Sequence, residues 1–199
     1  MTAIFRHPVR AASCLCAALA ACGGRASSAA KGGEPTPVRT IPLASGIVLE
    51  TAGPPPSDTT VTFTAGESRV IVLRHGPPEN VVFAEVSFAP QTFQADSGRP
   101  VRVEIHPRPG VYGIDLAASV PFSEGVSLVF KYPRYFSAPA KARAVYGSDA
   151  LYERGLAIGQ VLGTGQSLAL LPTSRPAPDN LRAALPAPGT YLVAAPESP

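Results

Sequence analysis

Prolines are spread along the whole chain, and they limit what it can fold into. The 199 residues include 23 prolines and 18 glycines. A proline inside a helix removes a hydrogen bond and clashes with the preceding turn, so this spacing disfavours long helices. Prolines are tolerated at turns and sheet edges, where they also hinder edge-to-edge aggregation. The chain is therefore expected to form short strands joined by turns.

Apolar and polar residues alternate between the turn residues. In residues 101–106, valine and isoleucine occupy the odd positions, whereas arginine, glutamate and histidine occupy the even ones. Comparable runs lie at 60–64, 69–73, 82–88, 114–116, 126–130, 142–146, 157–162, 167–171, 181–185 and 191–194. Gly163-Thr164-Gly165-Gln166 suits a hairpin between two of them. A period of two with regular turns predicts an all-β, antiparallel sandwich domain over residues 59–199.

The segment before this domain is harder to interpret. Residues 41–50 are compatible with a strand, and Gly53-Pro54-Pro55-Pro56 then interrupts the chain. Residues 40–58 are therefore expected to be an uncertain strand followed by a proline-rich linker. The sequence leaves open whether this strand joins the sheet.

The three cysteines lie within the first 22 residues, at Cys14, Cys16 and Cys22. The rest of the chain therefore has no disulfide framework, no Cys-ligated zinc site and no catalytic cysteine. The formal net charge is +3, and Arg6 and Arg10 account for two of its 17 cations. The remaining 15 cations against 14 acids give +1, so nucleic acid is not expected as a partner.

A basic start followed by a short apolar run, Ala11–Ala21, is typical of an export signal. The run is about half the length of roughly 20 residues that a membrane-spanning helix needs. It ends in Leu19-Ala20-Ala21-Cys22-Gly23, which resembles the lipobox of bacterial lipoproteins. The resemblance implies a signal peptide at 1–21, cleavage before Cys22, and a diacylglyceryl group with further acyl chains such as palmitate. An ordinary secretory signal cut near Ala18–Ala20 is the alternative.

The lipobox resemblance also implies a location. Covalent lipid on Cys22 would hold the protein on a membrane of the cell envelope, because several acyl chains bind far better than one. Residue 23 is glycine rather than the aspartate that retains such lipoproteins in the inner membrane. This favours the outer membrane, on its periplasmic or surface face, if the source is Gram-negative. Residues 22–39 are rich in Gly, Ala, Ser and Pro and are expected to be a flexible tether.

The C-terminal half resembles ZU5-type β-sandwich domains. Phe122, Val126, Leu128, Phe130 and Tyr132 occupy the apolar positions of that family's "x-F-x-x-P-V-x-L-x-F-x-Y" strand, and the ending 189–193 is similar to its closing strand. Gly125 stands where the family usually has proline. The resemblance implies a ZU5-like sandwich, with an Ig-like one as the alternative, and a protein-binding or adaptor role.

The chain offers few residues for catalysis. His75 and His106 are the only histidines after the leader, and no Gly-x-Ser-x-Gly motif is present. Glu104 and His106 share one face of a predicted strand, and Asp115 could lie on the next, which makes them weak candidates for a metal site. A solvated outer face explains them equally, because Arg102 lies there too. The chain is not expected to be an enzyme.

The best surface candidate for ligand binding is one short segment that mixes aromatic and cationic residues: Lys131, Tyr132, Arg134, Tyr135 and Phe136. Aromatic rings beside cations can stack on sugars or hold acidic peptides. The alternative is that Tyr132 and Phe136 cap the core while the cations face water. The chain has no tryptophan, which weakens a carbohydrate-binding interpretation.

Two functions remain open. The first is a lipid-anchored, non-catalytic binding or structural module whose partner is an envelope protein or polymer. The second is a lipoprotein that binds a small ligand or a metal. No cofactor is expected beyond the covalent lipid on Cys22.

Overall fold

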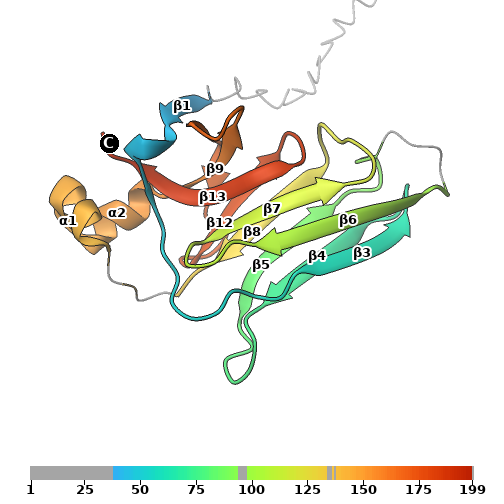
Figure 1. Cartoon of the computed structure of the whole chain (residues 1–199), viewed down its shortest axis with the longest axis horizontal. Helices are drawn as coiled ribbons and strands as arrows, with labels where there is room; N and C mark the ends of the chain where they lie inside the picture. Colours follow the sequence, from blue (N-terminus) through green and yellow to red (C-terminus); the bar gives the residue numbers. More distant parts are fainter. Residues whose placement is uncertain (1–37, 94–97, 134–135, 137, 199) are drawn as a thin grey trace, which may run out of the picture. The chain divides into compact units, whose positions relative to one another are not determined.

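Two antiparallel sheets form a β-sandwich, which confirms the predicted fold class (Figure 1). The structure is a computed structural model, and it describes residues 38–198 except 94–97, 134–135 and 137. The larger sheet contains β1 (Arg39–Pro42), β2 (Gly46–Val48), β3 (Thr59–Thr64), β6 (Pro100–Pro107), β7 (Gly113–Ala118), β9 (Ala157–Leu162), β10 (Ser167–Leu170) and β13 (Gly189–Pro196). The smaller sheet contains β4 (Arg69–Arg74), β5 (Val82–Phe88), β8 (Val126–Lys131), β11 (Thr173–Ser174) and β12 (Asn180–Leu185).

The order of strands brings distant parts of the chain together. The larger sheet runs β1-β10-β9-β13-β7-β6-β3, and β2 pairs with β13 beside this path. The smaller sheet runs β11-β12-β8-β5-β4. The predicted hairpin at 163–166 is confirmed, since β9 pairs with β10 across it. Residues 39–48, which the sequence left uncertain, supply β1, a short 3-10 turn (Leu43–Ser45) and β2.

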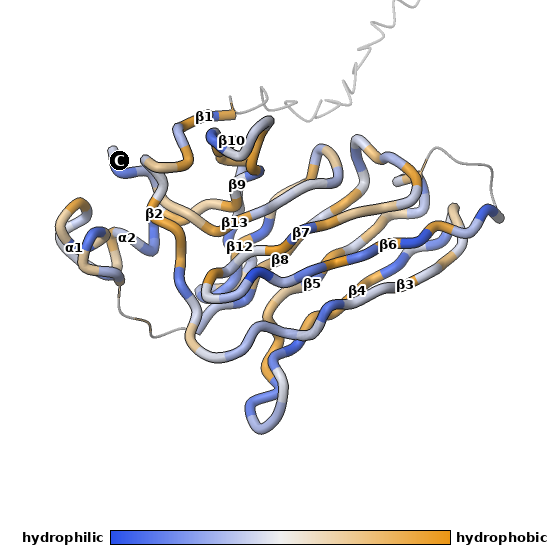
Figure 2. Tube along the Cα trace, in the orientation of Figure 1, coloured by the Kyte–Doolittle hydropathy of each residue, from blue (hydrophilic) through white to orange (hydrophobic). Residues whose placement is uncertain are grey.

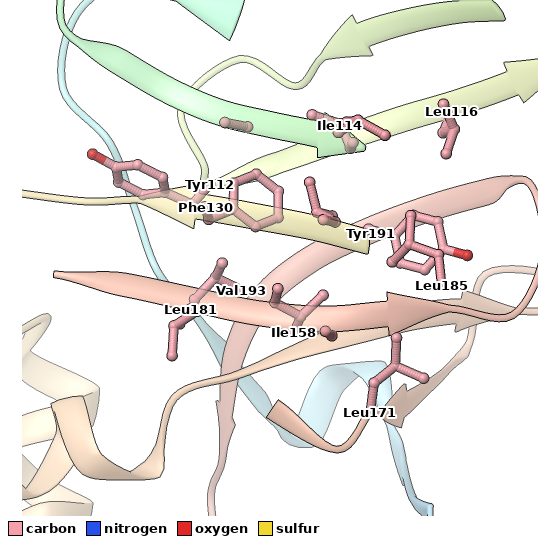
Figure 3. Packing of buried hydrophobic residues seen from close by; sticks show 14 of the residues in the cluster. Tyr112, Ile114, Leu116, Phe130, Ile158, Leu171, Leu181, Leu185, Tyr191 and Val193 are labelled. Carbon is pink, nitrogen blue, oxygen red and sulfur yellow. The ribbon is translucent and has the colours of Figure 1, made fainter. Parts of the chain in front are cut away.

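The core fills the space between the two sheets. The core forms because apolar and polar residues alternate along strands such as β4, β5 and β6, so that the apolar side chains share one face (Figure 2). Phe130 from the smaller sheet and Ile114, Tyr191 and Val193 from the larger one are all fully buried (Figure 3). Complete burial of such side chains stabilises a fold by about 1.5–3 kcal/mol each.

One predicted strand is a helix. Residues 142–146 were expected to alternate as a strand, but they lie in α1 (Ala140–Tyr146), which α2 (Asp149–Gly155) follows. Alanine, lysine and arginine favour helix, and this local preference outweighs the apparent period of two. Gly147, with φ of 74°, ends α1, and the Ser148 side chain accepts a hydrogen bond from the Leu151 amide to begin α2.

Two tyrosines attach these helices to the larger sheet. The Tyr146 hydroxyl donates to the Pro196 carbonyl at 2.6 Å, and the Tyr152 hydroxyl donates to the Ile47 carbonyl at 3.2 Å. The helices are therefore tied to β13 and β2 of the larger sheet.

Gly125 precedes β8 in a conformation that proline cannot adopt. Its φ is +76°, whereas the proline ring holds φ near −65°. The Thr92 hydroxyl donates to the Gly125 carbonyl at 2.8 Å, and Thr92 is almost fully buried. Proline, the residue of the ZU5-type pattern at this position, would therefore not fit the backbone observed here.

The chain enters the sandwich at an edge, where β1 packs beside the C-terminus. The Arg39 guanidinium donates to the Ser198 carbonyl at 2.7 Å. Ile41 of β1 belongs to a small apolar cluster with Leu168 and Ala194 that is separate from the main core.

Candidate functional site

A pocket of about 920 Å³ opens at one end of the sandwich. It lies where the segment after β2, the β4–β5 hairpin, the β6–β7 turn and the chain after β8 meet. In Figure 1 the β4–β5 hairpin projects from the sheets, close to the curved β2–β3 connection. Its lining consists of residues 49–52, 74–75, 79–82, Tyr112, 131–133, Phe136 and Asp179.

A β-bulge in β5 shapes one wall. The pairing between β4 and β5 shifts at Leu73/Arg74, so that Arg74 pairs with Val82 and Leu73 with Ala84. Phe83 is the extra residue, and both Phe83 and Ala84 are fully buried. A bulge breaks the normal alternation in this way and turns a side chain to the other face.

Phe83 supports the aromatic side of the pocket. Its ring stacks on Tyr112 with centroids 5.3 Å apart and meets Phe130 edge-on at 5.6 Å. The ring of His75, which directly follows β4, also meets Phe83 edge-on at a centroid distance of 5.3 Å. Tyr112 and His75 line the pocket, so Phe83 in the bulge links the buried core to the pocket wall.

Tyr112 lies at the start of β7, and backbone hydrogen bonds hold it against the segment after β2. Its amide donates to the Leu49 carbonyl at 2.9 Å, and the Thr51 amide donates to the Gly110 carbonyl at 3.0 Å. Figure 3 shows its ring beside Phe130, with the hydroxyl directed away from Ile114. Burial raises the pKa of the Tyr112 phenol, and the negative charge of Glu79 raises it further.

Three of the five predicted ligand-binding residues line this pocket: Lys131, Tyr132 and Phe136. Arg134 and Tyr135 lie outside the described residues. The Lys131 ammonium forms an ion pair with Glu85 on the neighbouring strand at 2.7 Å. Lys131 is therefore held along the sheet surface at the pocket wall.

Tyr132 serves the core and the pocket at once. Its hydroxyl lies 3.0 Å from both the Glu153 carboxylate and the Pro178 carbonyl, and its ring meets Phe136 edge-on at 5.7 Å. Burial and the hydrogen bond to Glu153 raise the pKa of Tyr132 above its usual value. The alternative for this segment was that Tyr132 caps the core. Tyr132 does so, and it also lines the pocket.

The weak metal candidates Glu104, His106 and Asp115 share one outer face of the larger sheet, and His106 and Asp115 pair across β6 and β7. Each has another partner. Arg102 lies 2.8 Å from Glu104, and Asp115 binds the Arg108 guanidinium at 2.9 Å.

Asp115 and His106 also bind residues outside the candidate metal set. The Thr190 hydroxyl donates to Asp115 at 2.6 Å. His106 Nδ1 lies 2.9 Å from Asp58, whereas its Nε2 is 3.9 Å from Glu104. The hydrogen bond to Asp58 raises the pKa of His106. Within the described residues, no group of three or more His, Cys, Asp or Glu side chains is arranged to hold a metal ion.

The sequence did not point to most of the pocket. Glu50, Glu79, Asn80 and Asp179 come from three separate segments, and only the fold brings them together. Residues 75–80, His-Gly-Pro-Pro-Glu-Asn, have the composition of a turn, but that composition does not indicate which segments lie beside it.

No family model, curated protein or solved structure matches this chain significantly. The likeness to ZU5-type domains and to lipoproteins therefore rests on the residues named above. Within the described part of the chain, no helix is long and apolar enough to cross a membrane. Cys22 lies outside the described residues.

Proposed function

We propose that this chain is a lipid-anchored, non-catalytic binding module of the cell envelope that takes a small organic ligand into the pocket at the end of its sandwich. The pocket is the observation that carries the proposal. Its volume of about 920 Å³ lies within the range of roughly 300–1,000 Å³ that is usual for ligand sites.

The chemistry of the wall also supports ligand binding. Apolar side chains such as Leu49, Val81 and Phe136 form part of it, and a few polar groups converge among them. This mixture provides apolar contact area together with orienting contacts, as is typical of small-molecule sites. The wall is held rigidly by the Phe83–Tyr112 stack and by the hydrogen bonds of Tyr132.

A pair of tryptophan substitutions tests the pocket. Val81 lines it and is 52% exposed, whereas Val70 on β4 is 58% exposed and is not among the lining residues. Val81→Trp should fill the mouth without disturbing the core, and Val70→Trp is the matched control. In a thermal-shift screen of small molecules, stabilising compounds should act on the wild type and Val70→Trp but not on Val81→Trp. Equal responses from all three proteins would contradict the proposal.

The anchor is proposed from the sequence alone. Cys22 follows a lipobox-like Leu19-Ala20-Ala21, and Gly23 favours the outer membrane in a Gram-negative cell. Cys22→Ala should abolish lipid attachment, shift the protein to the soluble fraction and change its processed mass by the acyl groups. A variant that still partitions with membranes at the same processed mass would exclude lipidation.

An envelope protein or polymer as partner remains a second candidate. It is favoured by the resemblance to ZU5-type domains, which are mostly adaptors. Loss of a partner on Val70→Trp but not on Val81→Trp would support that function instead, because β4 lies at the edge of the smaller sheet.

A further inference from the structure

Three carboxylates line the pocket. Glu50, Glu79 and Asp179 come from the segment after β2, the β4–β5 hairpin and the segment before β12. None of them forms an ion pair with any residue that the structure describes. Their negative charges are therefore available to a ligand.

The two described cations of the pocket do not cancel these charges. Lys131 is neutralised by Glu85 at 2.7 Å, so that pair contributes no net charge. Arg74 donates to the Asn80 carbonyl at 3.2 Å, which positions its guanidinium but leaves its charge. Arg74 and the three carboxylates together give +1 − 3 = −2. Adding the formal charge of Arg134, which lies outside the described residues, would still leave −1.

One of the carboxylates acts on the aromatic wall. Burial is the main cause of the raised pKa of Tyr112, and the negative charge of Glu79, which lines the same pocket, adds to it. Half-buried Phe136 and His75 offer further ring surface on the same pocket. A cation beside an aromatic ring is attracted by the ring's negative face, and nearby carboxylates strengthen that attraction.

We infer that the ligand of this pocket is an organic cation, an amine or quaternary ammonium group joined to an apolar body. The apolar body would contact Leu49, Val81 and Phe136, and the cationic group would lie toward Glu79 and Glu50. This inference rests on the proposed function, because it assigns a ligand class to the same pocket. An anionic ligand of the same shape would meet a net negative wall.

Three probes that share a phenyl ring and a short chain test the charge preference: 2-phenylethylamine, 2-phenylethanol and 3-phenylpropionate. They would be titrated into the full-length Cys22→Ala chain, which carries no lipid, and followed by NMR shifts of pocket residues. We expect the amine to bind about tenfold more tightly than the alcohol, a free-energy difference of about 1.4 kcal/mol. The carboxylate should bind more weakly than the alcohol.

Charge-removing variants identify the source of the preference. The double variant Glu50→Gln/Glu79→Gln should reduce the tenfold preference for the amine to about twofold or less, because two of the three carboxylates are gone, and should leave binding of the alcohol unchanged. Glu67→Gln, in the exposed β3–β4 turn and outside the pocket, is the matched control and should have no effect.

The remaining outcomes separate the cation assignment from the proposed ligand-binding function. Tightest binding of the carboxylate, or equal binding of all three probes, would overturn the cation assignment and leave the pocket as a ligand site. An amine preference that survives the double variant would overturn it as well. If no probe shifts the pocket residues at millimolar concentration, the cation assignment and the proposed ligand-binding function both fail.

Discussion

The rings of Phe83 and Tyr112 are stacked 5.3 Å apart with an angle of only 14° between their planes. Phe83 is the extra residue of the bulge in β5, and Tyr112 lines the pocket. The shape of the pocket wall therefore depends on an irregularity in the opposite sheet.

Phe83→Ala should destabilise the fold by about 3–5 kcal/mol, because it leaves a cavity among fully buried aromatic rings. Urea unfolding measures this loss. Val72→Ala, at a 41% exposed position on the neighbouring strand, should stay within about 0.5 kcal/mol of the wild type. A small loss of stability in Phe83→Ala would mean that the aromatic cluster does not depend on Phe83.

Gly125→Ala should cost more stability than Gly163→Ala. Both glycines have positive φ, +76° and +55°, so each substitution carries a backbone cost of about 1–2 kcal/mol. A Cβ at Gly163 meets nothing within 4 Å, whereas one at Gly125 would lie 2.6 Å from the Thr92 hydroxyl oxygen. The difference between the two denaturation midpoints measures the steric cost of the clash with Thr92. Equal losses of stability would show that Thr92 moves aside without cost.

The ion pair of His106 predicts a pH dependence on the outer face of the larger sheet. Its pKa is raised above 6.5, mainly by the hydrogen bond to Asp58, with Glu104 and Asp115 adding to it. A raised pKa means that the stabilisation is complete below about pH 6.5 and is lost as the pH rises through the folded pKa. The thermal midpoint of the wild type should therefore exceed that of His106→Asn most clearly in acid.

An NMR titration checks the source of this shift directly. Asp58→Asn should lower the pKa of His106 toward its ordinary value. An unchanged pKa of His106 in Asp58→Asn would contradict this assignment.

Tyr191 should make the fold sensitive to alkali. Burial raises its pKa from 10.0 to about 12, and its hydroxyl donates to the Ala187 carbonyl. Its contribution to stability is therefore complete below about pH 10 and is lost as the pH rises toward 12. Tyr191→Phe should be less stable at neutral pH yet lose less of its stability between about pH 9 and 12. Identical alkaline profiles would contradict this assignment.

The sequence predicts the strands well because their alternation is a local property. Residues 101–106, for example, place Val103 and Ile105 inside and Arg102 outside, as the structure shows. The local pattern failed at 142–146, where strong helix formers imitate alternation over a few residues. The bulge at Phe83 could not be predicted either, because it arises from the pairing of β5 with β4.

The pocket was only partly accessible to sequence reasoning. Tyr132 and Phe136 could be singled out because aromatic and cationic residues gather in one segment. Glu50 and Asp179 are 129 residues apart in the chain (179 − 50), and no local pattern relates them. Both line the pocket because the order of strands in the two sheets brings their segments to the same end of the sandwich.

The edge position of β1 has a mechanical consequence. β1 is held by a four-residue pairing with β10 and by the contact of Arg39 with Ser198. Ile41 packs in a cluster separate from the main core, so loss of this strand would remove no side chain from the contact between the facing sheets. We therefore expect that a force applied at the N-terminal end of the described chain separates β1 from β10 before it disturbs the main core.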